Sequence, residues 1–457
     1  MSRGGNKPQP PTDEELLYII DTEDIVEVIE LDDDDFADLL SSDENNDDDD
    51  DQEEGVEKGK TGNTGPIETG HISTVIAFDN TGVIESDDTS AIQSDDTGAI
   101  QSDDTGAVQS DNTVVFKGHG DAVFCVSIEP VIFKYAVTGG QDDKAIVWNV
   151  KTGETVFECT GHKDSVTAVG FSHDGDLIAT GDLGGFIQVW DFATQQVVWE
   201  FECSDIEWLK WHHNSHVLFA GTSDGNFWMF KISSEETKTF PGHGPSAASG
   251  VICPDGKRAC VGYQDGVIKI WNLEKTTCVH TISGANAHAS SVVSLACHHD
   301  NVLIVSGATD NTAKLINTET GKVVATLPCS GKPGAAAESE SVEAVGFSPV
   351  MPWVATGNLT GELEIWDLSS HIVRQRCHHE RGIVKLMWDK ESPFVYTASL
   401  DGQLQLWDAR NGEIIKQWKG HTAEILDFDI SFKGHIIITT SEDKTARVFP
   451  SATSGKS

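Results

Sequence analysis

Short runs of alternating apolar and polar residues fill the chain from residue 112 to residue 450, and turns rich in glycine and Asp separate them. Alternation over four to eight residues predicts half-buried β-strands. Eight of these runs end in an aromatic or aliphatic residue, often followed by Asp or Asn. These end residues are Trp148, Trp190, Phe230, Trp271, Ile316, Trp366, Trp407 and Phe449, spaced by 42, 40, 41, 45, 50, 41 and 42 residues. The regular spacing predicts eight repeated four-stranded β units.

A Gly-His pair precedes the strands of several units, as Gly161-His162 does in the second. With the Trp-Asp ending, this pair is typical of WD repeats, which the units therefore resemble. Each WD repeat forms one blade, so the resemblance implies an all-β fold, an eight-bladed WD40 β-propeller. Such propellers mostly present faces and loops to partners, which favours binding over catalysis.

The resemblance also implies a structural network within each blade, in which a His, a Ser or Thr, an Asp and the terminal Trp share hydrogen bonds. Units one and seven match it in full, with His119, Thr138, Asp142 and Trp148 and with His379, Thr397, Asp401 and Trp407. The eighth unit has His421, Thr439 and Asp443 but ends in Phe449. Elsewhere the network decays: Gly184 and Thr360 stand where units two and six should have Asp, and unit three lacks a clear Gly-His pair.

Histidines and acids in such sets invite a catalytic-triad hypothesis. A set that recurs once per blade is typical of a structural device and not of a single active site. The adjacent pairs His212-His213, His298-His299 and His378-His379 suggest metal binding, but neighbours on a strand point to opposite faces, so we interpret them as surface histidines. The sequence therefore predicts no enzyme, no metal and no cofactor.

Charge separates the chain into two parts. The net charge is −43, and residues 1–111 hold 33 Asp and Glu against 4 Lys and Arg. The remaining 346 residues carry 41 acids and 27 bases, so the propeller is acidic too. This balance argues against direct binding to nucleic acid or anionic membrane and favours a basic protein or peptide partner.

Cysteine usage and hydropathy bear on the compartment. Nine cysteines are scattered without a CxxC pair, no apolar run approaches 18 residues, and the N-terminus lacks a signal-peptide core. We expect reduced thiols, no transmembrane segment and a cytoplasmic monomer that can also be nuclear or membrane-associated through partners.

Residues 1–54 form an acidic tail. Thr12 to Glu15 fits a capping box before a short helix, and the strand-forming Ile25 to Ile29 precedes the acids Asp32 to Asp35. A strand-former beside acids resembles peptides that add a strand to a ubiquitin-like modifier. Docking on the chain's own propeller, or no binding at all, is the favoured interpretation.

Residues 55–111 are of low complexity and contain an eight-residue repeat with one apolar residue per repeat, at Ile84, Ile92, Ile100 and Val108. One apolar residue in eight cannot build a core, so the segment is predicted to be a disordered linker. The propeller is expected at 112–450 and a C-terminal tail at 451–457. In propellers the last blade is commonly completed from the other terminus, and residues 112–116 are placed to do this.

Longer segments resemble one particular family. TGGQDDKAIVW, ECTGHKDSVTAVGFSHD, IEWLKWH, PDGKRACVGYQDG, SLDGQLQLWDAR and GHTAEILDF, within residues 119–449, are similar to the angio-associated migratory cell protein family. The acidic DIVEVIELDDDD resembles that family's N-terminal region, whereas the octads do not. The resemblance implies similarity to a fungal propeller that is a dedicated chaperone of one large-subunit ribosomal protein. It also implies a link to cell migration and angiogenesis.

Two function classes therefore compete. The first is a chaperone or assembly factor in ribosome biogenesis that binds a basic ribosomal protein of the large subunit. The second is a signalling scaffold in cell migration. The acidic propeller favours the first class, because fixed acids attract and shield a basic extension.

The face that carries the Gly-His loops is the predicted partner-binding surface. By the strand assignment it carries a set of acids and one tryptophan: Asp121, Asp164, Asp205, Glu207, Trp208, Glu343, Glu380, Glu424 and Asp427. Each acid alone is typical of a solvated loop, and their recurrence on one face suggests a collective site. Trp208 fits either the centre of the ring or the core of a blade.

We predict that residues 32–110 are disordered in the free protein, because the charge and the sparse apolar residues cannot offset the entropy of ordering the chain. Amide hydrogen exchange there should be complete within seconds. Protected amides through the octads would contradict this prediction.

Overall fold

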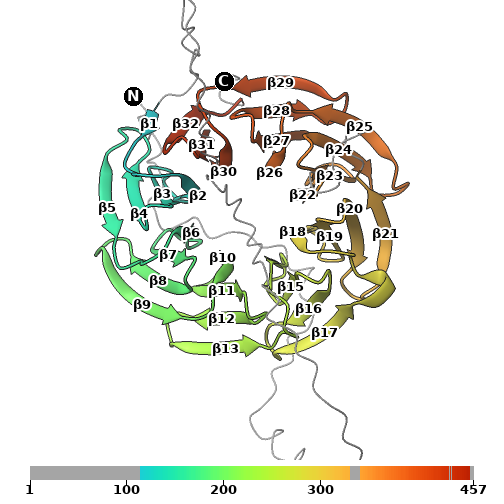
Figure 1. Cartoon of the computed structure of the whole chain (residues 1–457), viewed down its shortest axis with the longest axis horizontal. Helices are drawn as coiled ribbons and strands as arrows, with labels where there is room; N and C mark the ends of the chain where they lie inside the picture. Colours follow the sequence, from blue (N-terminus) through green and yellow to red (C-terminus); the bar gives the residue numbers. More distant parts are fainter. Residues whose placement is uncertain (1–113, 330–339, 432, 434, 453–457) are drawn as a thin grey trace, which may run out of the picture. The chain divides into compact units, whose positions relative to one another are not determined.

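The computed structural model describes residues 114–329, 340–431, 433 and 435–452. The described strands form eight four-stranded antiparallel sheets arranged as the blades of a ring (Figure 1). The eight-bladed WD40 propeller is thus confirmed, and the eight end residues of the repeats all lie on the third strand of a blade. The predicted helix and strand of the acidic tail and the octad linker lie outside the described residues.

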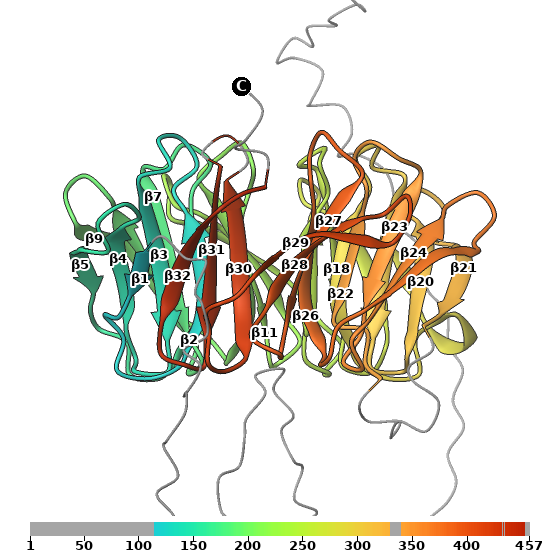
Figure 2. The same cartoon turned by 90° about the horizontal axis from the view of Figure 1, so that it is seen from above.

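Each blade runs from an inner strand near the ring axis to an outer strand at the rim (Figures 1 and 2). The inner strands are β2 (Val123–Ile128), β6 (Val166–Phe171), β10 (Ile206–Trp211), β14 (Ser249–Ile252), β18 (Val292–Cys297), β22 (Ala344–Phe347), β26 (Ile383–Trp388) and β30 (Ile425–Ser431). The second strands are β3 (Tyr135–Gly140), β7 (Leu177–Asp182), β11 (Val217–Thr222), β15 (Arg258–Gly262), β19 (Leu303–Ala308), β23 (Trp353–Gly357), β27 (Phe394–Ser399) and β31 (Ile436–Ser441).

The third strands are β4 (Ala145–Asn149), β8 (Phe186–Asp191), β12 (Phe227–Lys231), β16 (Ile268–Asn272), β20 (Thr312–Asn317), β24 (Glu362–Asp367), β28 (Leu404–Asp408) and β32 (Ala446–Pro450). The outer strands are β5 (Thr155–Cys159), β9 (Gln196–Glu202), β13 (Glu236–Phe240), β17 (Thr277–Ile282), β21 (Val323–Pro328), β25 (Val373–His378), β29 (Glu413–Trp418) and β1 (Val114–Phe116). A 3₁₀ turn, Gly284–Asn286, is the one helical element described, and no described helix is long and apolar enough to cross a membrane.

The core lies between blades, because each sheet is covered on both faces by its neighbours. Every residue of β7 is buried, whereas β9 at the rim is mostly exposed. One buried cluster joins Val137 and Val147 of the first blade to Ile178 and Trp190 of the second. This double burial explains why the middle strands are rich in apolar residues, β-branched ones among them.

The ring is closed by the segment that precedes the first blade. β1 pairs with β32 in antiparallel register, with Val114 opposite Val448 and Phe116 opposite Ala446. Phe116 is 2% exposed and its ring stacks on Trp148 of the first blade at 4.6 Å. The strand thus completes the last blade and packs against the first, while residues 112 and 113 of the expected closing segment lie outside the described residues.

A second device joins the blades around the ring axis. At each of the eight seams between adjacent inner strands, a side chain of one strand bonds to its neighbour. At the seam of the last and first blades, Asp427 and Asp429 of β30 accept the amides of Val126 and Ile128 at 3.0 and 2.8 Å. These amides lie on a strand edge that has no further strand to pair with.

The other seams use different chemistry for the same purpose. Ring nitrogens of three tryptophans, Trp208, Trp211 and Trp388, donate to carbonyls of the neighbouring blade at 2.9 Å. Hydroxyls act at further seams: Ser249 and Ser294 donate to carbonyls, and Ser127 accepts an amide. Lys385 donates to Asp427 at 2.7 Å.

We predict that a chain beginning at residue 118 melts at a lower temperature than one beginning at residue 105, because only the longer chain retains β1. Within the longer chain, Phe116→Ala should cost about 3–5 kcal/mol through loss of the buried ring. Thermal unfolding by circular dichroism measures both effects. Equal melting temperatures for the two chains would show that β1 does not close the ring.

Candidate functional site at the centre of the ring

The His-Asp networks define one face of the propeller. In the first blade, His119 bonds through Nδ1 to Asp142 and through Nε2 to Thr138, both at 2.9 Å, and Trp148 donates to Thr138 at 3.3 Å. The His lies in the loop before the inner strand, and the Asp lies in the turn after the second strand. The network therefore ties these two connections together on what we call the upper face.

The seventh and eighth blades repeat this arrangement. His379 bonds Thr397 at 2.6 Å and Asp401 at 3.4 Å, while Trp407 donates to Thr397 at 2.9 Å. In the eighth blade, His421 bonds Thr439 and Asp443 at 2.7 and 2.9 Å. These histidines are buried, as expected for groups that fix a blade and not for groups that meet a substrate.

Two blades retain more of the network than the sequence suggested. In the second blade Asp182, two residues before Gly184, bonds His162 at 3.1 Å, so the set is shifted and not lost. The fifth blade has His288 bonded to Ser306 at 2.8 Å and to Asp310 at 3.1 Å. The missed signals were an Asp at the end of the second strand in the second blade and, in the fifth, a histidine that no glycine directly precedes.

Two of the adjacent histidine pairs lie in loops, as expected, but not for the reason given. His212-His213 and His298-His299 follow the ends of β10 and β18, so strand alternation does not separate them. Their rings approach to 4.5 and 4.1 Å between centroids. The argument that neighbours point to opposite faces was therefore wrong for these two pairs.

A cavity of about 370 Å³ lies where the inner strands meet, and it gathers part of the predicted surface. Its lining comes from six blades and includes Asp205, Glu207, Trp208 and Glu343 of the predicted set. Ser246 donates to Glu207 at 2.6 Å, and Ser341 donates to Glu343 at the same distance. Acids from two distant blades, Asp205 and Glu207 of the third and Glu343 of the sixth, thus line one cavity.

Trp208 combines the two positions that the sequence left open. It is 8% exposed and donates to the Ala247 carbonyl, so it belongs to the seam between the third and fourth blades. A Cβ on Gly221 or Gly250 would lie 2.1 Å from its ring, which explains why both flanking positions lack side chains. Its ring also borders the cavity, where it offers an apolar wall.

The cavity holds a lysine that the sequence did not single out. Lys210 of β10 lines it and donates to the Gly250 carbonyl at 2.7 Å. Burial lowers the pKa of Lys210 to about 8, and the charge of Lys385 contributes to this shift. Burial also raises the pKa of Glu343, and the Ser341 bond offsets only part of that rise. Lys210 thus places a basic group among the acids that line the cavity.

Three predicted acids are engaged in ion pairs. Asp121 pairs with Lys444 at 3.1 Å, and Glu424 pairs with Arg381. Asp427 is held by Lys385 and by the Val126 amide, so it serves the seam. The structure does not gather these three acids at the cavity.

The remaining predicted acids, Asp164 and Glu380, are exposed in upper-face loops of the second and seventh blades. Asp205 is exposed at the cavity. Among residues that the structure describes, none of these three forms an ion pair. They are the predicted acids most accessible to a basic ligand.

The fold and its repeats place the chain among WD40-repeat propellers. The WD domain, G-beta repeat, matches residues 110–149, 153–191, 234–272 and 276–317. The anaphase-promoting complex subunit 4 WD40 domain matches residues 345–451.

The chain belongs to the angio-associated migratory cell protein family. It is 45% identical over 344 residues to the human angio-associated migratory cell protein, covering 74% of this chain and 79% of the relative. It is also 24% identical over 374 residues to the ribosome assembly protein SQT1 of Saccharomyces cerevisiae, covering 75% of this chain and 84% of the relative.

Solved structures share the fold. The chain superimposes on Chaetomium thermophilum Sqt1, bound to the N-terminus of the ribosomal protein L10, with a TM-score of 0.68 and 22% identity. That similarity covers 75% of this chain and 100% of the solved chain. Saccharomyces cerevisiae Sqt1 gives a TM-score of 0.69 at 21% identity, covering 76% of this chain and 100% of that chain.

The buried networks predict a pH-dependent stability. Burial lowers the pKa of His162 and His421, and Asp182 and Asp443 offset only part of that effect. The pKa values of these histidines are therefore lower in the folded chain than in the unfolded chain. As the pH falls, the unfolded chain binds protons at a higher pH than the folded chain does. The free energy of unfolding should fall as pH drops below about 6.5 and level off once pH passes the lower, folded pKa values.

We therefore expect a lower melting temperature at pH 5.5 than at pH 7.5. A variant with His162→Gln and His421→Gln should be less stable at pH 7.5 and lose less stability on acidification. A variant that keeps the full wild-type pH dependence would contradict this account.

Proposed function

We propose that this chain is a non-enzymatic binding platform that holds a basic extension of a large-subunit ribosomal protein over the centre of its upper face. The observation that carries the proposal is the convergence of Asp205, Glu207 and Glu343 at one cavity of the ring. Acids at a fixed spacing attract Lys and Arg side chains and accept their hydrogen bonds.

The size and shape of the cavity favour an extended segment over a folded domain. A volume of about 370 Å³ accommodates a few side chains. The apolar wall of Trp208 suits the aliphatic stem of a Lys or Arg side chain. The positive charge of Lys210 repels a Lys or Arg side chain of the ligand that enters the cavity. We therefore expect the basic segment to lie across the opening.

The relatives support the same class of ligand. Sqt1 of Chaetomium thermophilum is bound to the N-terminus of ribosomal protein L10, and the Saccharomyces cerevisiae relative is a ribosome assembly protein. We propose the corresponding N-terminal segment as the ligand of this chain and the cytoplasm as the place of binding. The second candidate is a scaffold in cell migration, which the name of the 45% identical human relative favours.

Replacing Asp164, Asp205 and Glu380 by Lys should weaken binding of the L10 N-terminal peptide at least about tenfold, because a like charge replaces each attraction. These side chains are exposed, so the melting temperature should change little. Reversal of Glu343 or Asp427 is unsuitable, since both make structural bonds. Isothermal titration calorimetry at 0.1 M and 1 M salt measures the affinity, which should fall as screening increases.

The matched control reverses Glu200, Glu236 and Glu274, which are exposed away from the cavity and change the net charge equally. The control should bind nearly as tightly as the wild type. Equal losses in both triple variants would mean that net charge, and not this site, attracts the peptide. If the wild-type chain does not bind the peptide but does bind proteins involved in cell migration, the result would favour the scaffold.

A further inference from the structure

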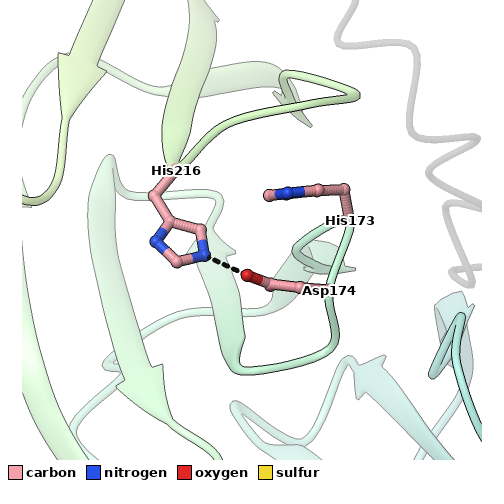
Figure 3. A group of neighbouring side chains, drawn as sticks. All are labelled: His173, Asp174 and His216. Carbon is pink, nitrogen blue, oxygen red and sulfur yellow. Dashed lines mark hydrogen bonds and ion pairs between the residues drawn. The ribbon is translucent and has the colours of Figure 1, made fainter. Parts of the chain in front are cut away.

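A group of side chains suited to metal binding lies on the lower face, which carries the turns between inner and second strands. His173 and Asp174 lie in the turn between β6 and β7, and His216 lies just before β11 in the next blade (Figure 3). One potential ligand atom from each of the three residues lies within 4.8 Å of the others. Within the described ranges, this is the one group of three or more His, Cys, Asp or Glu side chains with that geometry.

The carboxylate of Asp174 is already oriented. Its Oδ1 accepts the Ser172 hydroxyl at 2.7 Å and the Asp176 amide at 3.3 Å, while Oδ2 meets Nε2 of His216 at 2.7 Å. An Asp side chain is ionised at neutral pH, and the carboxylate is the form that a metal ion requires.

The two imidazoles lie next to this carboxylate. The His173 and His216 rings are 5.6 Å apart between centroids, and Figure 3 shows both beside Asp174. The neighbouring His212 is engaged elsewhere, since its Nδ1 bonds Ser215 and its Nε2 bonds the Gly256 carbonyl. His173 is exposed, and His216 and Asp174 each retain 34% of their side-chain exposure, so an ion can enter from solvent.

We propose that His173, Asp174 and His216 bind a divalent transition-metal ion of the zinc type, with water in the fourth position. Two imidazoles and a carboxylate suit Zn²⁺, whereas Ca²⁺ and Mg²⁺ prefer oxygen ligands alone. Bonds of about 2.1 Å to tetrahedral Zn²⁺ place ligand atoms about 3.4 Å apart. Asp174 Oδ2 and His216 Nε2, which lie 2.7 Å apart, would separate slightly, while wider separations in the group, which reach at most 4.8 Å, would shorten. The ion would link the second and third blades.

The chain offers a matched control. His243 and Asp265 form a similar pair at 2.9 Å, with 31% and 38% of their side-chain surface exposed. No third ligand completes that pair among residues with described side chains. If a His-Asp ion pair alone cannot hold zinc, the His243–Asp265 pair should bind none. The group that adds His173 to the His216–Asp174 pair should bind one ion.

Zinc binding to the full chain, prepared without a histidine tag, tests the proposal by competition with a chromophoric zinc chelator near neutral pH. We expect one zinc ion per chain, with a higher melting temperature in zinc than in EDTA. His173→Ala and His216→Ala should each lower the affinity about tenfold or more, and Ser172→Ala should weaken it by loosening Asp174. His243→Ala should bind as the wild type does.

The His173 variant separates loss of a zinc ligand from loss of folding, because removing an exposed side chain leaves the fold intact. Melting temperatures in EDTA should confirm this for every variant. Absence of zinc binding, or equal affinity in the wild type and the His173 and His216 variants, would overturn the proposal. A comparable loss in the His243 variant would overturn it as well.

Discussion

The inner edge of each blade imposes the constraint on which the rest of this propeller depends. An inner strand has a partner on one side only, and its other edge faces the ring axis with unpaired amides and carbonyls. Here each seam places a side chain against that edge, so adjacent blades are linked by hydrogen bonds as well as by apolar packing. Each bond contributes about 1 kcal/mol, and together they fix the spacing of the ring.

This requirement decides which polar groups remain for binding. Asp427, Asp429 and Lys385 lie near the axis, but their side chains are already bonded across the two seams of the eighth blade. Burial raises the pKa of Asp429, and Lys385 offsets only part of the rise, which is typical of a group held for structure. The acids around the central cavity belong to other blades, where Trp and Ser side chains serve the seams.

The repeated units could be predicted because their signals are local and recur eight times. Turn residues, alternating strands and the terminal aromatic residue are each visible within about 40 residues. The His-Asp networks of the first, seventh and eighth blades followed from the same period. The fifth was missed although Asp310 keeps its place, because no glycine directly precedes His288. In the second blade Asp182 moved by two residues, and a fixed offset could not detect it.

The site was only partly predictable. The topology shows on which face of the propeller a loop residue lies, but it does not show which side chains contact that residue. Nothing in the sequence shows that Lys444 reaches Asp121 or that Arg381 reaches Glu424 from another blade. Lys210 was missed because a lysine in an inner strand has no distinctive motif. The His173, Asp174 and His216 group depends on two turns that are neighbours only in the closed ring.

The most direct test of the account is to locate the ligand on the surface. A photo-crosslinking residue at position 205 borders the central cavity, and the same residue at position 200 lies exposed on the outer strand β9. With the L10 N-terminal peptide, the account predicts a covalent adduct from position 205 and none from position 200. Adducts from position 200 alone, or equal yields from both positions, would contradict binding at the centre of the ring.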